Sequence, residues 1–185
     1  MNRYISDLHF GHNNVIRFDR RPFENADDMD TKMIELWNSR VSPNDDVYID
    51  GDLCCGNAKP PHWYLSQLKG HKHLILGNHD EVVLKDKQCL KYLESISQME
   101  FITDADKIIV LCHYPICDWY KGRYGSWHIY GHIHCRRNEV YDFMRTRDHA
   151  LNAAACINGY APVSFEELIQ NNYKFQNEIV SDDKG

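Results

Sequence analysis

Metal-capable side chains follow five short apolar segments of this sequence. Asp7 and His9 follow the first segment, and His132 and His134 follow the last, each pair separated by one residue. In extended backbone, residues two apart project from the same side, so each pair would point toward one site while the residue between points away. The full set of candidate ligands is Asp7, His9, Asp52, Asn78, His113, His132 and His134.

The donor atoms of this set favour transition-metal ions. Two carboxylates, one amide and four imidazoles suit manganese, iron, zinc or similar ions better than magnesium or calcium. Seven ligands are too many for one such ion, and the two oxygens of Asp52 could serve two ions at once. Two ions about 3.5–4 Å apart hold an attacking hydroxide and a phosphoryl oxygen together for in-line displacement. The set therefore predicts hydrolysis of a phosphate ester.

The segments that must position these ligands are typical of buried strands, because they are short and rich in Ile, Val and Tyr. Helices are expected between them: one is capped by Asn25 and ends near residue 41, one opens at the proline pair 60–61, and one begins with a capping box of Ser164 and Glu167. Such alternation indicates an α/β fold with its site at the carboxyl ends of the strands. The predicted strands cover residues 3–6, 47–50, 73–76, 108–112 and 127–130.

Three glycines precede candidate ligands. Gly51, Gly77 and Gly131 each lie at the bend between a predicted strand and a ligand. We expect a positive φ or a close backbone approach at these positions, because a side chain there would crowd the ions.

The motifs together resemble those of the calcineurin-like metallophosphoesterases. The resemblance runs in order from residue 4 to residue 134, and the segments 6–12 and 21–23 look like those of the small stand-alone bacterial and phage members. It implies an α/β fold with two β-sheets in a sandwich flanked by helices, the four-layer metallophosphoesterase architecture. The motifs are Asp7-x-His9, Gly51-Asp52, Gly77-Asn78-His79-Asp80, His113 and Gly131-His132-x-His134.

The resemblance also implies a role for each matched residue. Asp7, His9 and His134 would hold one divalent ion, and Asn78, His113 and His132 would hold the other. Asp52 would bridge the two ions, with manganese preferred and iron, zinc or nickel as alternatives. His79 would protonate the departing oxygen or stabilise the transition state, and Asp80 would orient the ring of His79.

The sequence departs from the family at the phosphate clamp. Many protein phosphatases of the family continue from Gly-Asp through an aspartate to an arginine that grips phosphate, whereas residues 51–56 read Gly-Asp-Leu-Cys-Cys-Gly. A residue that binds the phosphate of the substrate must then come from another part of the chain. His12 and Arg21 are the candidate substrate contacts, although a solvent-facing His12 and a solvated arginine cluster remain open alternatives. Further arginine candidates are Arg17, Arg20 and Arg123.

Composition indicates an ordinary soluble chain, with one domain over residues 1–173 and a polar tail over 174–185. Seven scattered cysteines without zinc-type spacing are expected to be reduced thiols, and no run approaches the length of a membrane span. The expected location is the cytoplasm. A net charge of −6 argues against a stable nucleic-acid complex, and the oligomeric state leaves no trace.

The predicted function is hydrolysis of phosphodiester or phosphomonoester bonds by a hydroxide that bridges two metal ions. The partner is then a small phosphate-ester substrate, with nucleotides among the candidates. The alternative is a metal-binding scaffold protein on the same fold that has lost catalysis.

Overall fold

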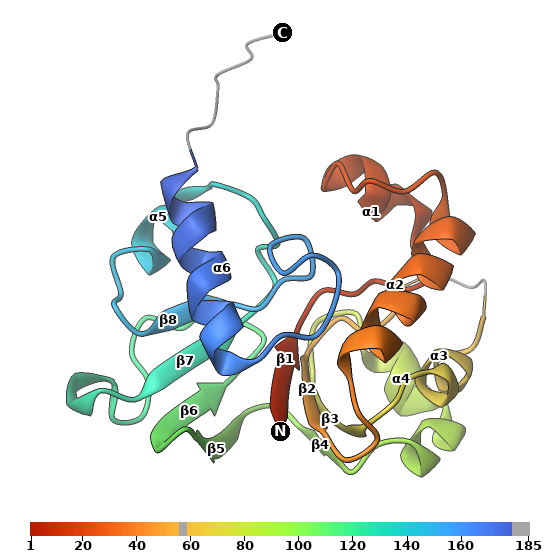
Figure 1. The fold of residues 1–185 in the computed structure, drawn as a ribbon, viewed down its shortest axis with the longest axis horizontal. Coiled ribbons are helices and arrows are strands. Elements are labelled where there is room, and N and C mark those ends of the chain that lie inside the picture. Colours follow the sequence, from red (N-terminus) through yellow and green to blue (C-terminus); the bar gives the residue numbers. More distant parts are fainter. Residues whose placement is uncertain (56–58, 179–185) are drawn as a thin grey trace, which may run out of the picture.

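A computed structural model describes residues 1–55 and 59–178 and contains two four-stranded β-sheets flanked by helices (Figure 1). The sheets have the strand orders β1-β2-β3-β4 and β5-β6-β7-β8. This arrangement confirms the predicted α/β sandwich. None of the helices within the described ranges combines the length and the apolar character that crossing a bilayer requires.

The first sheet is parallel throughout. Its strands are β1 (Asn2–Ile5), β2 (Asp46–Asp50), β3 (His71–Ile75) and β4 (Ser95–Ser97). Helices cover its outer face, as expected for a parallel sheet whose strands are connected by crossovers. All its strands therefore end at one edge.

The second sheet is parallel except at one edge. Its strands are β5 (Glu100–Asp104), β6 (Lys107–Leu111), β7 (Trp127–Tyr130) and β8 (Ala150–Asn152). A hairpin joins β5 to β6 in antiparallel pairing, whereas β6, β7 and β8 run parallel to one another. The carboxyl ends of β6 and β7 can therefore also meet at one edge of the molecule.

The two sheets pack face to face through a shared apolar core. Tyr4 and Ile75 of the first sheet lie in one buried cluster with Ile109 and Ile129 of the second. Backbone hydrogen bonds tie the sheets together beyond the strands, since Ser6 N–H donates to the Ala153 carbonyl at 2.8 Å. The sandwich thus brings the ends of β1 and β7 close in space although they are far apart in sequence.

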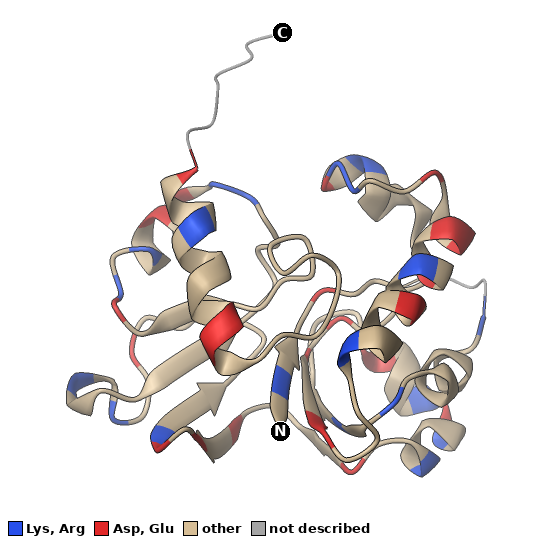
Figure 2. Cartoon of the chain, in the orientation of Figure 1, with Lys and Arg blue, Asp and Glu red and all other residues tan. Residues whose placement is uncertain are grey.

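Helices cover the outer faces. The first sheet carries α1 (Asn13–Phe18), α2 (Ala26–Arg40), α3 (Pro61–Gln67) and α4 (Glu81–Lys85), and the second carries α5 (Glu139–Met144) and α6 (Phe165–Asn177) (Figure 1). Two 3₁₀ turns complete the elements, η1 (Lys87–Lys91) and η2 (Gly122–Tyr124). Figure 2 shows acidic and basic residues interspersed over the helices of both sheets.

The local helix signals in the sequence are confirmed. The Asn25 side chain accepts a hydrogen bond from Asp28 N–H at the start of α2, and both bonds of the capping box open α6. The three strands not predicted are β4, β5 and β8. The helix α6 continues to Asn177, into the segment assigned to the tail, and residues 179–185 of that segment lie outside the described residues.

The capping box gives a stability prediction. Replacing Ser164 with Ala removes the hydroxyl that accepts from Glu167 N–H at 3.2 Å. We expect the free energy of unfolding to fall by about 1 kcal/mol, measured from urea unfolding curves. Ser39→Ala is the matched control, because the Ser39 hydroxyl donates to a carbonyl of its own helix and caps no N-terminus. Equal unfolding midpoints for the two variants would contradict the assigned role.

Candidate metal centre

All seven candidate ligands follow the carboxyl ends of strands. Asp7 and His9 follow β1, Asp52 follows β2, and Asn78 follows β3, while His113, His132 and His134 follow β6 and β7. Positive φ angles between 53° and 69° are found at both pairs of ligands, Asp7 with His9 and His132 with His134. The expectation of extended backbone at these pairs is therefore wrong. The residues between the ligands, Leu8 and Ile133, are nevertheless buried in the core.

One buried cluster unites the first and last motifs. The ligand atoms of Asp7, His9, Asp52 and His134 all lie within 4.8 Å of one another. His9 Nε2 lies 3.1 Å from His134 Nε2 and 3.5 Å from Asp52 Oδ2, and His134 Nε2 lies 3.4 Å from Asp7 Oδ1. This group could hold a metal ion.

The three remaining candidates form a second group, which contacts Asp52 through His113. His113 Nε2 is 3.6 Å from Asp52 Oδ2, and His132 Nδ1 is 2.9 Å from Asn78 Oδ1. The rings of His113 and His132 lie edge to face with centroids 5.4 Å apart. One oxygen of Asp52 thus faces both groups, while Oδ1 accepts a hydrogen bond from His79 N–H at 2.9 Å.

The donor set fits divalent cations. His113 Nδ1 donates to the Asp50 carbonyl at 2.7 Å, so the lone pair of Nε2 points at Asp52, and this buried nitrogen has no hydrogen-bond partner among the described residues. Likewise, His134 Nδ1 donates to Asp19 Oδ2 at 2.6 Å, so its Nε2 presents a lone pair to His9 and Asp7. Imidazole nitrogens and carboxylate oxygens that converge in this way can be satisfied by a metal ion.

Burial keeps two of these imidazoles neutral, which is the form that binds metal. Burial lowers the pKa of His9, and the charges of His134 and Arg21 lower it further. The pKa of His132 is lowered by burial and by His113. For His134, burial lowers the pKa but the hydrogen bond to Asp19 and the charge of Asp7 outweigh it, so that the pKa is raised.

A buried ion pair of Arg21 and Asp19 supports the backbone of the first motif. The Arg21 guanidinium donates to the carbonyls of Asp7 and Leu8 at 2.8 Å and to Asp19 Oδ2 at 3.1 Å. Because this side chain is buried and its donors are engaged, the expectation that Arg21 contacts substrate is wrong. Asp19, which the sequence reasoning missed, orients His134 as carboxylates orient metal-binding histidines in other proteins.

Asp80 does not orient the ring of His79. Its carboxylate accepts hydrogen bonds from the N–H groups of Gly77, Asp52 and Leu53 at 2.8–2.9 Å. Asp80 is buried and fastens the β3 loop to the loop that carries Asp52. The predicted contact with His79 is therefore corrected: Asp80 holds backbone, and the His79 ring instead lies 5.3 Å from that of His9, with Nδ1 3.7 Å from Cys55 Sγ.

All three predicted glycines permit close approach of the ligands, and a Cβ at Gly77 would overlap Asp52 Oδ1 and lie 3.0 Å from the His113 ring. Gly51 has φ +86°, and a Cβ there would overlap the His113 ring. At Gly131 a Cβ would lie 2.5 Å from Ser6 Oγ and 2.7 Å from Asp7 Oδ2. The absence of a side chain at these positions is what allows β2 and β7 to end against ligands from other strands.

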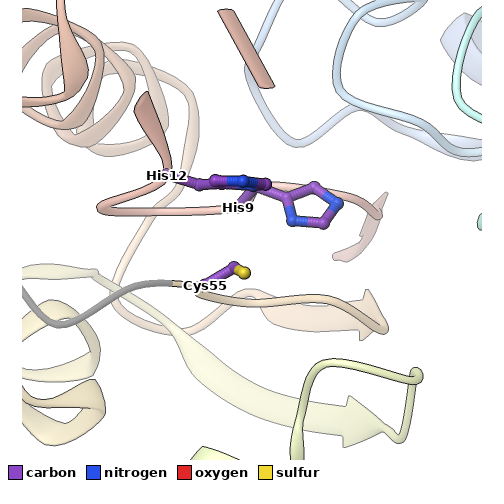
Figure 3. Close-up of side chains that lie close together, drawn as sticks. All are labelled: His9, His12 and Cys55. Atoms are coloured by element: carbon purple, nitrogen blue, oxygen red, sulfur yellow. The ribbon is translucent and has the colours of Figure 1, made fainter. Parts of the chain in front are cut away.

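His12 and Cys55 lie above the buried cluster. Figure 3 shows both side chains close to His9, and their ligand atoms form a second group within 4.8 Å of one another. The His12 ring lies 5.4 Å from that of His9, which places the predicted substrate contact at the site. Burial lowers the pKa of His12, as does the charge of His79. Cys55 is a free thiol, as expected of all seven cysteines, and it lies beside the candidate ligands.

A cavity of about 330 Å³ opens over the cluster. Five of the seven candidate ligands line it, together with His12 and His79. Its rim contains Phe18, which is exposed, and Arg136, the arginine that follows His134 by two residues. The other candidate clamps, Arg17, Arg20 and Arg123, do not line it. Arg136 was missed because charge runs are more often solvated than functional.

Sequence comparison shows one relative over nearly the whole chain. The uncharacterized protein MJ1445 of Methanocaldococcus jannaschii is 31% identical over 168 residues, which cover 90% of this chain and 88% of that protein. The Gene 66 protein of Mycobacterium phage D29 is 28% identical over 159 residues, covering 72% of this chain and 78% of that protein. No protein-family model matches the sequence.

Comparison with solved structures also finds a protein of similar fold. The protein of unknown function AQ665 from Aquifex aeolicus superposes with a TM-score of 0.69 and 26% identity over 92% of this chain and 98% of that chain. The E. coli phosphoesterase Yfce gives a TM-score of 0.42 and 14% identity over 83% and 77% of the two chains. The two flanked sheets carry the five motifs at one edge in the predicted order, so the fold that the resemblance implied is confirmed.

The role of Asp19 can be tested by metal binding. Asp19→Asn leaves a side chain of the same shape but removes the negative charge that holds His134 Nδ1–H. We expect affinity for manganese to fall by about 10- to 100-fold, measured by calorimetry. Asp118→Asn, an exposed aspartate outside the site, is the control. Unchanged affinity in Asp19→Asn would show that His134 needs no orienting partner.

Proposed function

We propose that this chain, which belongs to the same protein family as MJ1445 and resembles the calcineurin-like metallophosphoesterases, is a phosphoesterase that depends on two divalent metal ions. The observation that carries the proposal is the position of Asp52 Oδ2, which lies 3.5 Å from His9 Nε2 and 3.6 Å from His113 Nε2. A carboxylate oxygen between two groups of lone-pair donors suits a bridge between two ions.

The candidate ligands form two groups, one for each ion, and manganese is the metal that we expect. Asp7, His9 and His134 would hold one ion, and Asn78, His113 and His132 would hold the other. When bound, such ions supply positive charge for the phosphoryl oxygens and lower the pKa of the attacking water. The buried ligands fix the geometry, and the cavity above them admits the ester.

His79 supplies the proton for the departing oxygen. Its backbone N–H donates to Asp52 Oδ1 at 2.9 Å, so the residue is fixed to the same carboxylate that bridges the ligand groups. The side chain is exposed and lines the cavity, where an ester oxygen can reach it. Asp80 accepts hydrogen bonds from the N–H groups of Gly77 and Asp52, and so holds the backbone segments that carry His79 and Asp52.

Arg136 supplies the phosphate clamp that the Gly51-Asp52 segment lacks. It is exposed and is the arginine among the residues that line the cavity. A guanidinium forms charge-assisted, bidentate hydrogen bonds with phosphate oxygens. The ester would therefore lie between the ligand cluster and Arg136, with Phe18 at the rim.

Substitution of the bridge tests the proposal. Asp52→Asn keeps the shape of the side chain but removes the charge shared between the ions, so turnover of bis(p-nitrophenyl) phosphate with manganese should fall by more than about a hundredfold. Asp46→Asn, at the opposite end of the same strand, is the control. Unchanged turnover in Asp52→Asn would reject the bridge. Metal binding by the native chain without turnover of any ester would instead favour the inactive scaffold.

The clamp has its own test. Arg136→Ala should raise KM for the same diester by about tenfold or more, because a hydrogen bond to a charged group contributes about 1.5–3 kcal/mol. Arg123→Ala is the matched control, since Arg123 lines a different cavity that shares no residue with the one over the cluster. Steady-state kinetics distinguish the two variants, and equal KM values would exclude Arg136 as the clamp.

A further inference from the structure

A second cavity adjoins the metal centre and contains mostly apolar side chains. It measures about 480 Å³, within the range of about 300–1,000 Å³ typical of small-molecule sites. We call it the Tyr114 groove and define it by Leu76, Leu84, Met99, Cys112 and Tyr114, with Asn78 at its inner end. Helix α4 contributes Leu84, and Met99 lies between β4 and β5.

The groove is continuous with the proposed metal site. Asn78 lines both cavities, and its Oδ1 lies 2.9 Å from His132 Nδ1. The Tyr114 ring lies 5.0 Å from the His132 ring and 5.3 Å from the His113 ring, while nearly half of the residue remains exposed. A group attached to a phosphate over the cluster can therefore extend into the groove.

The charge of the groove restricts what it can hold. No Lys, Arg or His is found among its lining residues in the described part of the chain, and the charged residues there are Glu81 and the buried Asp80. Further phosphates or carboxylates on a substrate would meet negative charge and no cation. Exposed apolar surface at Leu84, Met99 and Tyr114 would instead gain by covering an uncharged hydrocarbon or aromatic group.

The proton donor faces away from the groove. His79 lines the cavity over the cluster, whereas its neighbours Asn78 and Asp80 line the groove. The ester oxygen that receives the proton of His79 is therefore on the side of the cluster cavity. The group in the groove is the one that stays on phosphorus.

We propose that the Tyr114 groove binds the retained, apolar alcohol group of a phosphodiester substrate. The inference rests on the proposed phosphoesterase activity and names its substrate class. In the reaction, the water oxygen bonds to phosphorus as the bond to the departing alcohol oxygen breaks. His79 gives that oxygen a proton and regains one from solvent, which takes up the proton that the attacking water loses, and the second product is the phosphate monoester of the apolar alcohol.

A substrate series with a constant leaving group tests the groove. Methyl, butyl and hexyl p-nitrophenyl phosphates all release p-nitrophenolate, so only the retained alcohol changes. With the manganese-loaded chain, kcat/KM should rise by about threefold for each added methylene, because burying a methylene is favourable. Equal values for methyl and hexyl esters in the native chain would overturn the proposal.

Substitutions in the groove test whether the dependence of kcat/KM on chain length arises there. Leu84→Glu on α4 and Met99→Glu between β4 and β5 each place a carboxylate in the groove, and each should abolish the rise with chain length. Leu90→Glu, an exposed leucine outside the groove, should keep the rise. A rise preserved in both groove variants would overturn the proposal.

A binding measurement separates this inference from the proposed function. Calorimetry on the manganese-loaded chain should show that hexyl phosphate binds at least about tenfold more tightly than methyl phosphate. Tighter binding of hexyl phosphate in a chain that hydrolyses no diester would support the groove and reject the catalytic proposal. Hydrolysis of the methyl ester with equal binding of the two monoesters would reject the groove alone.

Discussion

The candidate metal centre is arranged around one oxygen atom, Oδ2 of Asp52. Asp52 Oδ2 lies between His9 and His113, two imidazoles whose elements belong to different sheets. His113 aims a lone pair at it, and His113 Nε2 and His9 Nδ1 are among the buried atoms without a partner in the described residues. Such an arrangement of acceptors is unfavourable in a protein interior unless a cation shares it. A divalent cation at this edge, as proposed, would satisfy these nitrogen atoms and link the two sheets.

The surrounding residues hold this unfavourable arrangement in place. Arg21 and Asp80 each fasten backbone at the strand ends, and Asp19 fixes one imidazole. Asp50 is fully buried, and burial raises the pKa of its carboxyl well above the usual value, with the charges of Asp7 and Asp80 adding to the effect. Several carboxyl groups thus gather beneath the site, and the raised pKa of Asp50 lowers the cost of burying them together.

Under the proposed function, selectivity for substrate would follow from what lies on each side of the cluster. One side has Arg136 and His79, the proposed phosphate clamp and proton donor. The other has an apolar groove without a cation among its described lining residues. A single phosphate with an organic group suits this combination better than a polyphosphate does.

The sequence by itself determined the candidate ligands, the five main strands and the helix caps, because these depend on residue type and on short spacing. Asp7 and His9, for example, need only the end of β1 to reach the site. The contacts of Arg21 and Asp80 and the position of Arg136 at the cavity were decided by the tertiary structure. A guanidinium contacts carbonyls or phosphate, and a carboxylate contacts an imidazole or backbone N–H groups, according to which segments pack beside it. That packing joins residues far apart in the chain, and no local pattern encodes it.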